Sequence, residues 1–240
     1  MSGLAIVTGA AGGLGTRIAG RLAEAGHELL LVDLDPGVAA AAEELERDGA
    51  IATPLVADLS VDAGAAAVAD AVATVGGSVA VLVNNAGITR DGRVAKTEES
   101  DFAAVIAINL VAPMRLALAL EPHFAAGSAV VNMSSRAALG NFGQANYVTS
   151  KSGLVGATRA LALRWAPRVR VNAVAPSLVD TPMTQAMPSE VLEKLVARIP
   201  AGRIGSPDDI AELVAFLASP EAGYVTGQVV FACGGRSLAA

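Results

Sequence analysis

Short apolar runs that alternate with alanine-rich segments constrain the fold of this chain most strongly. The runs are rich in valine, leucine and isoleucine and show no polar alternation. Buried strands of this kind, separated by helices, are typical of a parallel sheet covered by helices on both faces. We therefore expect an α/β fold with a doubly wound sheet of about seven strands, at 4–8, 28–33, 51–57, 79–84, 128–134, 169–174 and 228–232.

Nothing along the chain marks a domain boundary. Apolar residues make up 53% of the 240 residues, and no Pro/Ser-rich linker, charge block or short repeat interrupts them. Only 3% of the residues are aromatic, so alanine, valine, leucine and isoleucine must build the core. We expect residues 1–240 to form a single domain.

Charge and cysteine content exclude several classes of partner. A net charge of −6 argues against a nucleic-acid surface, which gathers lysine and arginine. Cys233 is the only cysteine, so an intramolecular disulfide is impossible, and no His, Cys or carboxylate cluster has the spacing of a metal site. Pro113 and Arg115 interrupt the longest apolar stretch, and no signal segment is recognisable. We expect a cytoplasmic protein that binds no metal, membrane or nucleic acid.

Polar residues gather where the expected strands end. In parallel sheets, ligands bind beyond the carboxyl ends of the strands. Five consecutive strand ends therefore indicate a single site, and the polar groups that follow them are Thr8 with Gly9, Asp33, Asp58, Asn84 with Asn85, and Ser134.

The glycine-rich segment from Thr8 to Gly15 lies between the first strand and a helix. Glycines let the backbone approach a pyrophosphate, and free N–H groups at a helix N-terminus favour its negative charge. Asp33 ends the next strand, eighteen residues after Gly15, where a carboxylate can bind ribose hydroxyls and would repel a 2′-phosphate. The segment contains no arginine or lysine, so the sequence predicts NAD(H) in preference to NADP(H).

Tyr147 and Lys151 stand four residues apart, in a chain with only two tyrosines. On a helix this spacing places both side chains on one face, where the ammonium can lower the tyrosine pKa towards neutrality. The alternative is an amphipathic helix with two unrelated polar residues. Ser134, thirteen residues before Tyr147, lies at a converging strand end and favours a catalytic group.

Asn109 precedes Pro113 by four residues. If 100–120 is helical, the Asn109 carbonyl has no partner, because proline lacks the N–H that would donate to it. A buried free carbonyl can hold a water molecule. The alternative is a proline kink in which Asn109 is only a polar filler.

Taken together, these motifs resemble the short-chain dehydrogenase/reductase family along nearly the whole chain. Within that family the chain is similar to the 3-oxoacyl-[acyl-carrier-protein] reductase branch. The motifs are Thr8-Gly9-x3-Gly13-x-Gly15, Asn84-Asn85-Ala86-Gly87, Asn109, Ser134, Tyr147-x3-Lys151 and Pro176-x4-Thr181 for the family, with 85–91, 143–147 and 199–205 for the branch.

The resemblance implies a Rossmann-type fold and a role for each matching residue. Hydride moves between a nicotinamide ring and a carbonyl or carbinol carbon, while Tyr147 moves the proton and Ser134 holds the substrate oxygen. Lys151 binds the nicotinamide ribose and lowers the Tyr147 pKa, and Asn109 holds a relay water. Ser135, next to Ser134, leaves a one-residue alternative.

The cofactor residues implied by the resemblance and the strand ends come from six segments. For Asp58 the alternative is a helix cap, and Ser177 stands where many relatives have glycine. The expected contacts are Gly9, Gly13, Leu14, Gly15, Asp33, Leu34, Asp58, Leu59, Asn85, Ala86, Gly87, Tyr147, Lys151, Pro176, Val179 and Thr181.

Substrate specificity is expected from 89–97, from 136–146 and from 182–200, which could close as a lid. The expected pocket walls are moderately apolar and suit an acyl chain or a small alcohol, and they are Arg136, Leu139, Phe142, Gln144 and Met183.

These observations predict an NAD(H)-dependent oxidoreductase that interconverts a ketone and a secondary alcohol, with a 3-oxoacyl or 3-hydroxyacyl thioester as substrate. The stretch 122–127 has little basic charge for docking an acidic carrier protein. Together with the NAD(H) preference predicted from Asp33, this argues against fatty-acid synthesis and favours a coenzyme A thioester or a free secondary alcohol. The alternatives are dehydrogenation of a steroid-like or other small secondary alcohol, and a non-catalytic nucleotide-binding scaffold. Helices expected at 103–120 and 148–165 are apolar on more than one face, which together with the resemblance predicts a homotetramer.

Overall fold

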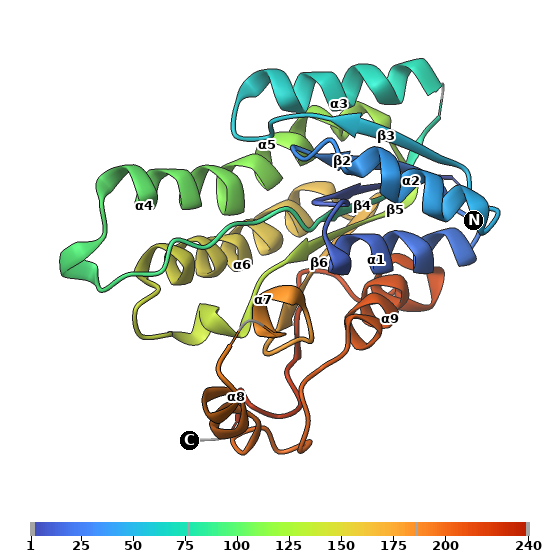
Figure 1. The fold of residues 1–240 in the computed structure, drawn as a ribbon. Helices are drawn as coiled ribbons and strands as arrows, with labels where there is room; N and C mark the ends of the chain where they lie inside the picture. Colours follow the sequence, from blue (N-terminus) through green and yellow to red (C-terminus); the bar gives the residue numbers. More distant parts are fainter. Residues whose placement is uncertain (1–2, 76, 186, 239–240) are drawn as a thin grey trace.

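Strands and helices alternate along the chain, as the sequence pattern predicts (Figure 1). The computed structural model describes residues 3–75, 77–185 and 187–238. The strands are β1 (Leu4–Thr8), β2 (Glu28–Asp33), β3 (Ala52–Val56), β4 (Val79–Asn84), β5 (Phe124–Met133), β6 (Val169–Pro176) and β7 (Val229–Ala232). The α-helices are α1 (Gly13–Glu24), α2 (Val38–Arg47), α3 (Asp62–Val75), α4 (Glu99–Ile106), α5 (Ala112–Ala119), α6 (Ala145–Trp165), α7 (Pro182–Gln185), α8 (Ser189–Val196) and α9 (Pro207–Ala218).

The described residues form one seven-stranded sheet in the order β3-β2-β1-β4-β5-β6-β7. Every neighbouring pair is parallel. The chain builds outward from β1 to β3 and then crosses to β4, so the strand order reverses between β1 and β4. Ligands bind at such a switch point in doubly wound sheets. The doubly wound α/β fold is therefore confirmed, although β5 begins at Phe124 rather than at residue 128, because Phe124 pairs with Val79 beyond an irregularity in the register.

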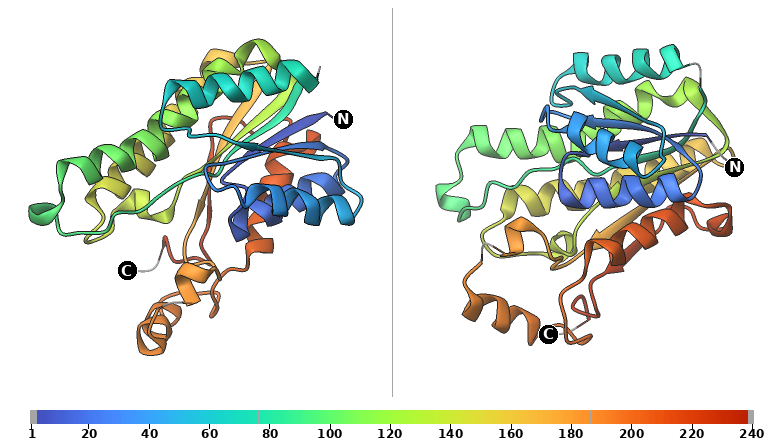
Figure 2. Two further views of the ribbon diagram at one scale, coloured as in Figure 1. Left: turned by 45° about the horizontal axis from the view of Figure 1, so that its top comes forward. Right: turned by 45° about the vertical axis from the view of Figure 1, so that its right-hand side comes forward.

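Helices cover both faces of the sheet (Figure 2), and an apolar core lies between the sheet and each layer of helices. Successive side chains of a strand point to opposite faces. In β1, Ala5 and Val7 join the core with residues of α1, α2 and α9, whereas Leu4 and Ile6 join the core with residues of α3, α5 and α6. Because both faces of the central strands are buried, β1 and β4 are apolar along almost their whole length. The edge strand β3 is largely exposed, and β6 carries the polar residues Arg170 and Asn172.

The helical stretch Glu99–Ala119 is the most apolar long helix among the described residues. Its mean hydropathy is 1.9, so by length and composition alone it could cross a membrane. In this fold α4 packs on α6 and α5 packs on α3. The stretch is not the uniform α-helix expected from the sequence, because Ala107–Val111 form a π-helical turn in which the Ala112 N–H donates to the Ala107 carbonyl. Pro113 interrupts the regular ladder by lacking an N–H, and the wider turn accommodates that gap.

Candidate active site

Two adjoining cavities open at the carboxyl edge of the sheet. The first, the glycine-lined cleft, has a volume of about 600 Å³ and is bounded by the loop 9–15 and by the ends of β2 and β3. The second, the Tyr147 cavity, has a volume of about 440 Å³ and is bounded by β5, β6, α6 and the segment 176–195. Five residues line both cavities, so together they form one continuous site; these are Leu14, Asn85, Gly87, Ile88 and Thr181. All sixteen residues expected to contact a cofactor line one or both cavities.

The loop between β1 and α1 requires glycine for close packing. Gly9 has a positive φ of 67°, and a Cβ atom on Gly15 would lie 2.1 Å from the Gly9 carbonyl oxygen. A Cβ on Gly13 would meet no atom within 4 Å, so this position faces open space. Gly12 provides no side-chain cap for α1, which leaves the first N–H groups of the helix available to an anion. These features fit a dinucleotide pyrophosphate.

Carboxylates dominate the charge of the glycine-lined cleft. Asp33 accepts hydrogen bonds from the Ala11 N–H (2.9 Å) and the Asp35 N–H (3.0 Å), which fix the carboxylate at the end of β2. Asp35 and Asp58 line the same cleft, and its described lining contains no arginine or lysine. A carboxylate can still accept from ribose hydroxyls, since each oxygen has two acceptor sites. An additional phosphate would meet only negative charge.

Helix α6 brings Tyr147 and Lys151 together, as their spacing predicts. Lys151 Nζ lies 5.6 Å from the centroid of the Tyr147 ring and donates a 2.7 Å hydrogen bond to the Met133 carbonyl. The Lys151 side chain is buried, while Tyr147 is partly buried. A Cβ on Gly87 would lie 3.2 Å from Asn109 Oδ1, which is a tight contact, and 3.4 Å from Lys151 Nζ, which is an ordinary van der Waals distance.

The structure corrects the expected direction of the Tyr147 pKa. Burial raises the pKa of Tyr147, a hydrogen bond with Ser135 lowers it in part, and the charge of Asp91 raises it further. Burial also lowers the pKa of Lys151 to about 8. The expected lowering of the Tyr147 pKa by Lys151 is therefore not what the protein alone shows, because Lys151 is itself desolvated and directs its ammonium to Met133.

The structure also corrects the assignment of Ser134. Ser134 Oγ donates to the Lys151 carbonyl at 3.0 Å, so this buried hydroxyl is bound to the main chain of α6. The serine side chain that lowers the pKa of Tyr147 is that of Ser135, whose Oγ also accepts from the Ala137 N–H. Both serines line the Tyr147 cavity, and the 3₁₀ turn after β5 (Arg136–Leu139) sets the path of the chain beside them. The hydrogen bond of Ser134 to the main chain therefore favours Ser135 as the serine that is free to bind a substrate oxygen.

Asn109 lies on the π-helical turn and is fully buried. Its Oδ1 accepts from the Ile88 N–H, and its Nδ2 donates to the Ile88 carbonyl, both at 2.9 Å. Nδ2 also lies 3.2 Å from Ser150 Oγ, which donates to the Tyr147 carbonyl. The side chain thus joins the 84–88 loop to α6, a contact that the sequence did not reveal. That the Asn109 carbonyl holds a relay water remains a prediction.

The expected substrate walls are only partly correct. Arg136 and Gln144 line the Tyr147 cavity, whereas Leu139 and Phe142 do not and are 58% and 89% exposed. Phe142 lies between Gly140 and Gly143, whose positive φ values turn the chain outward. Met183 belongs to α7, but its side chain lies outside the described part of the structure, as does residue 186 within the expected lid. In the expected lid, 182–200, the described side chains that line the cavity are those of Thr184, Met187 and Leu195.

Arg236, which no sequence motif indicated, lines the Tyr147 cavity and donates to Ser177 Oγ at 3.2 Å. Arg236 follows the carboxyl end of β7 by four residues. Applying the strand-end argument to the seventh strand would have found it, since β7 is parallel to the others and ends at the same edge.

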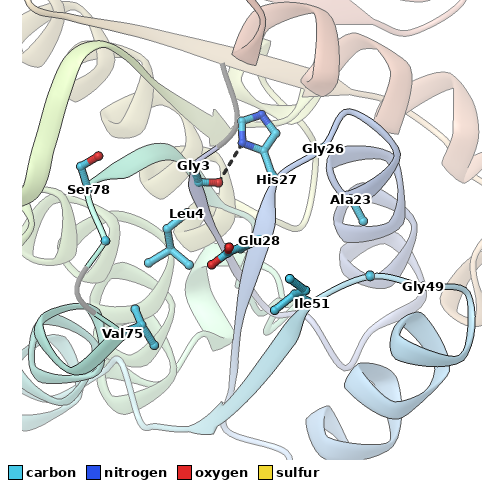
Figure 3. A pocket seen from close by; sticks show the side chains of 12 residues that line it. Gly3, Leu4, Ala23, Gly26, His27, Glu28, Gly49, Ile51, Val75 and Ser78 are labelled. Carbon is cyan, nitrogen blue, oxygen red and sulfur yellow. Dashed lines mark hydrogen bonds between the residues drawn. The ribbon is translucent and has the colours of Figure 1, made fainter.

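A third cavity, of about 470 Å³, lies at the opposite edge of the sheet, near the start of β1 and β2 (Figure 3). His27 Nδ1 lies 3.1 Å from the Gly3 carbonyl there, which ties the start of β2 to β1. The rest of the described lining is mainly glycine and aliphatic residues, together with Glu28. None of the predicted site residues lies there, so the chemistry belongs to the carboxyl edge.

Comparisons with known proteins agree with this geometry. A family model described as Enoyl-(Acyl carrier protein) reductase matches residues 9–237. The chain is 39% identical to the (2S)-[(R)-hydroxy(phenyl)methyl]succinyl-CoA dehydrogenase subunit BbsD of Thauera aromatica, with 98% of this chain and 96% of that protein covered. It is 37% identical to the 3-oxoacyl-[acyl-carrier-protein] reductase FabG of Thermotoga maritima, with 96% of each covered.

Two solved structures are also similar. A putative short-chain alcohol dehydrogenase from Sinorhizobium meliloti superimposes with a TM-score of 0.94 at 34% identity, covering 100% of this chain and 98% of that one. A putative NAD(P) dependent gluconate 5-dehydrogenase from Beutenbergia cavernae, with NADP bound at low occupancy, gives 0.92 at 38% identity, covering 98% and 97%.

Burial of the charged Lys151 side chain should make the protein less stable than a variant with an apolar residue at this position. We expect Lys151→Met to stabilise the protein at pH 7 by about 1–3 kcal/mol, because burial disfavours the charged lysine. Below pH 8 Lys151 is charged in both the folded and the unfolded protein, so the full free-energy cost of burying the charge lowers the stability of the fold. Between pH 8 and pH 10.5 the folded protein holds a neutral lysine, and this cost falls to zero as the unfolded chain also loses the proton. The advantage of the variant should therefore shrink over this range. Urea unfolding at pH 7 and pH 10 measures it, with the exposed Lys96→Met as control; a variant less stable than wild type at pH 7 would contradict the argument.

Proposed function

Because this chain belongs to the short-chain dehydrogenase/reductase family, an oxidoreductase family, we propose that it is an NAD(H)-dependent enzyme that interconverts a ketone and a secondary alcohol. One observation carries this proposal: Tyr147, Lys151 and Ser135 line a cavity that continues into the glycine-lined cleft. A substrate in the first cavity and a dinucleotide in the second would meet where the two cavities share residues. The preferred substrate class is a 3-oxoacyl or 3-hydroxyacyl thioester.

When bound, the nicotinamide group supplies or accepts the hydride. Tyr147 moves the proton: its raised pKa keeps the hydroxyl protonated at neutral pH, so that it can donate to a ketone oxygen during reduction. In the opposite direction the same oxygen must accept the proton that the carbinol loses. Hydride and proton thereby convert a carbonyl into a carbinol.

Ser135 is proposed to hold the substrate oxygen beside Tyr147. Its hydroxyl accepts from the Ala137 N–H and keeps its own proton for an acceptor in the cavity. Asn109 positions this group of residues indirectly, because its side chain fixes Ile88 and Ser150 on either side of Lys151. Such preorganised donors favour the charge that develops on the oxygen during the reaction.

The preference for NAD(H) rests on the three carboxylates of the glycine-lined cleft and on the lack of basic residues in its described lining. The structural relative with bound NADP shows that similar chains accept the phosphorylated cofactor. In this chain a 2′-phosphate near Asp33 would be repelled rather than paired. The proposed preference for NAD(H) therefore depends on the carboxylates of this cleft and not on the cofactor of any relative.

The preference for a thioester rests on relatives. Both curated proteins named above act, by their names, on thioesters of coenzyme A or of acyl carrier protein. A small or steroid-like secondary alcohol would use the same catalytic residues, so a panel of acetoacetyl-CoA, simple ketones and secondary alcohols separates these alternatives. A cytoplasmic homotetramer is part of the proposal, and it is supported by exposed apolar residues on α5 and α6 such as Leu118 and Leu163.

Tyr147→Phe tests whether the protein is an enzyme or a nucleotide-binding scaffold. We expect kcat to fall by about 10²–10⁴-fold while NADH still binds, because only the proton donor is removed. Tyr224→Phe is the matched control, since Tyr224 is the other tyrosine and is exposed. Turnover and NADH fluorescence titration provide the two measurements. Unchanged turnover in Tyr147→Phe would refute the mechanism.

The two adjacent serines provide a second test. We expect Ser135→Ala to reduce kcat/KM by about 10²–10³-fold, as loss of a donor to a developing oxyanion does. Ser134→Ala removes a buried hydrogen bond to α6 and should cost about 1 kcal/mol of stability, with less than about tenfold loss of kcat/KM. Steady-state kinetics and thermal unfolding of both variants measure these effects. If Ser134→Ala were the inactive variant, the original assignment would be restored.

Cofactor selectivity provides a third test. We expect the wild-type protein to bind NADH at least about tenfold more tightly than NADPH, and Asp33→Asn to reduce that ratio by weakening the bond to the ribose and the repulsion of the phosphate. Fluorescence titration with both cofactors measures the ratio. Asp70→Asn, an exposed carboxylate on α3, controls for net charge. Tighter binding of NADPH by the wild type would overturn the role given to Asp33.

A further inference from the structure

Two arginines project charge into the Tyr147 cavity. Arg136 comes from the 3₁₀ turn after β5, and Arg236 follows β7, so residues one hundred positions apart meet at one cavity. The described lining of this cavity contains Lys151 as a third cation and no aspartate or glutamate. This distribution contrasts with the whole chain, in which Asp and Glu number 23 and Lys and Arg number 17.

Arg136 lacks a protein partner for its buried nitrogen. Its Nε atom is buried and has no hydrogen-bond partner among the described residues, and no described carboxylate forms an ion pair with the guanidinium. A buried donor without a partner is costly, and more so when it carries charge. Because Arg136 also lines the cavity, an anion that enters there would meet a guanidinium whose charge no described carboxylate balances.

Arg236 stands in a similar environment. It is partly buried, and its one side-chain hydrogen bond among the described residues goes to the neutral Ser177 hydroxyl. Burial lowers the pKa of Arg236, and the positive charges of Arg136 and Arg198 lower it further, so these guanidinium groups repel one another across the site. An anion bound beside these groups would relieve their repulsion.

The phosphates of a dinucleotide cofactor are not the anion that these two arginines would bind. The residues that fit its pyrophosphate and ribose line the glycine-lined cleft, and neither Arg136 nor Arg236 lines that cleft. The arginines share their cavity instead with Tyr147 and Ser135, where the reacting carbon must lie. An anion bound there is therefore part of the substrate.

On this basis we propose that Arg136 and Arg236 select a substrate that carries a carboxylate near its ketone or carbinol carbon. The inference rests on the proposed function, because it assigns the substrate class of the same site. Guanidinium groups bind carboxylates through paired, charge-assisted hydrogen bonds, which fix the orientation of the ligand as well as its affinity. The substrate would thus be held at two points, with its oxygen at Tyr147 and Ser135 and its carboxylate at the arginines.

Two matched thioesters test the proposal. The N-acetylcysteamine thioesters of 3-oxohexanoate and 3-oxoadipate differ in that a carboxylate replaces the terminal methyl group of the acyl chain, and neither contains phosphate. We expect the wild type to favour the 3-oxoadipyl thioester at least about tenfold in kcat/KM. Arg136→Gln and Arg236→Gln should each reduce kcat/KM for this acid by about 10–100-fold, mainly through KM, and leave the neutral thioester within about threefold.

Further arms separate the competing explanations. Arg47→Gln, an exposed arginine on α2, should change neither substrate and controls for net charge. Arg136→Lys should recover part of the preference for the acid, since it keeps the charge and loses the planar fork. Equal loss on the acidic and neutral thioesters would overturn the proposal and leave the arginines a structural role.

The source of the anion needs its own comparison. The coenzyme A thioester of 3-oxohexanoate adds phosphates to the neutral substrate. If the arginine variants impair this compound while the two N-acetylcysteamine thioesters remain equivalent, the anion is a coenzyme A phosphate and the carboxylate assignment is wrong. If the wild type reduces none of the thioesters and no simple ketone, the proposed function fails instead, which is a distinct outcome.

Discussion

The burial of Lys151 holds the site together. Its ammonium donates to the Met133 carbonyl at the end of β5, and Ser134 Oγ donates back to the Lys151 carbonyl, so strand and helix are joined in both directions. The same contacts place Tyr147 one turn earlier on α6, facing the cavity. Burying this charge lowers the pKa of Lys151 to about 8. Stability is thereby lowered in order to keep a cation beside Tyr147, the residue proposed to move the proton.

A second constraint starts from Pro113. Because proline cannot donate to the helical ladder, the chain between α4 and α5 widens into a π-helical turn, and this turn carries Asn109 to the interior. The Asn109 side chain then satisfies both polar groups of Ile88 and contacts Ser150. A single backbone irregularity thus fixes the loop that separates the two cavities and the helix that carries Tyr147.

The sequence predicted the cofactor side of the site better than the substrate side. Every expected cofactor residue lines the joined cavities, because strand ends and glycine spacing translate directly into position in a parallel sheet. Among the expected substrate walls, Leu139 and Phe142 point to solvent instead, and Arg236 was not anticipated. These residues lie on turns whose path depends on local dihedral angles and on distant contacts, which periodicity does not encode.

By itself, the sequence determined the doubly wound sheet, the glycine cradle, the carboxylates around it and the pairing of Tyr147 with Lys151. All of these follow from regular periodicities of strand and helix, whose geometry is fixed by backbone hydrogen bonding. Only the tertiary structure decided between Ser134 and Ser135, since a one-residue shift reverses the direction of a side chain. The tertiary structure also placed Arg136 and Arg236 in the lining of one cavity, because the strands that precede them, β5 and β7, end at the same edge of the sheet although they lie far apart along the chain.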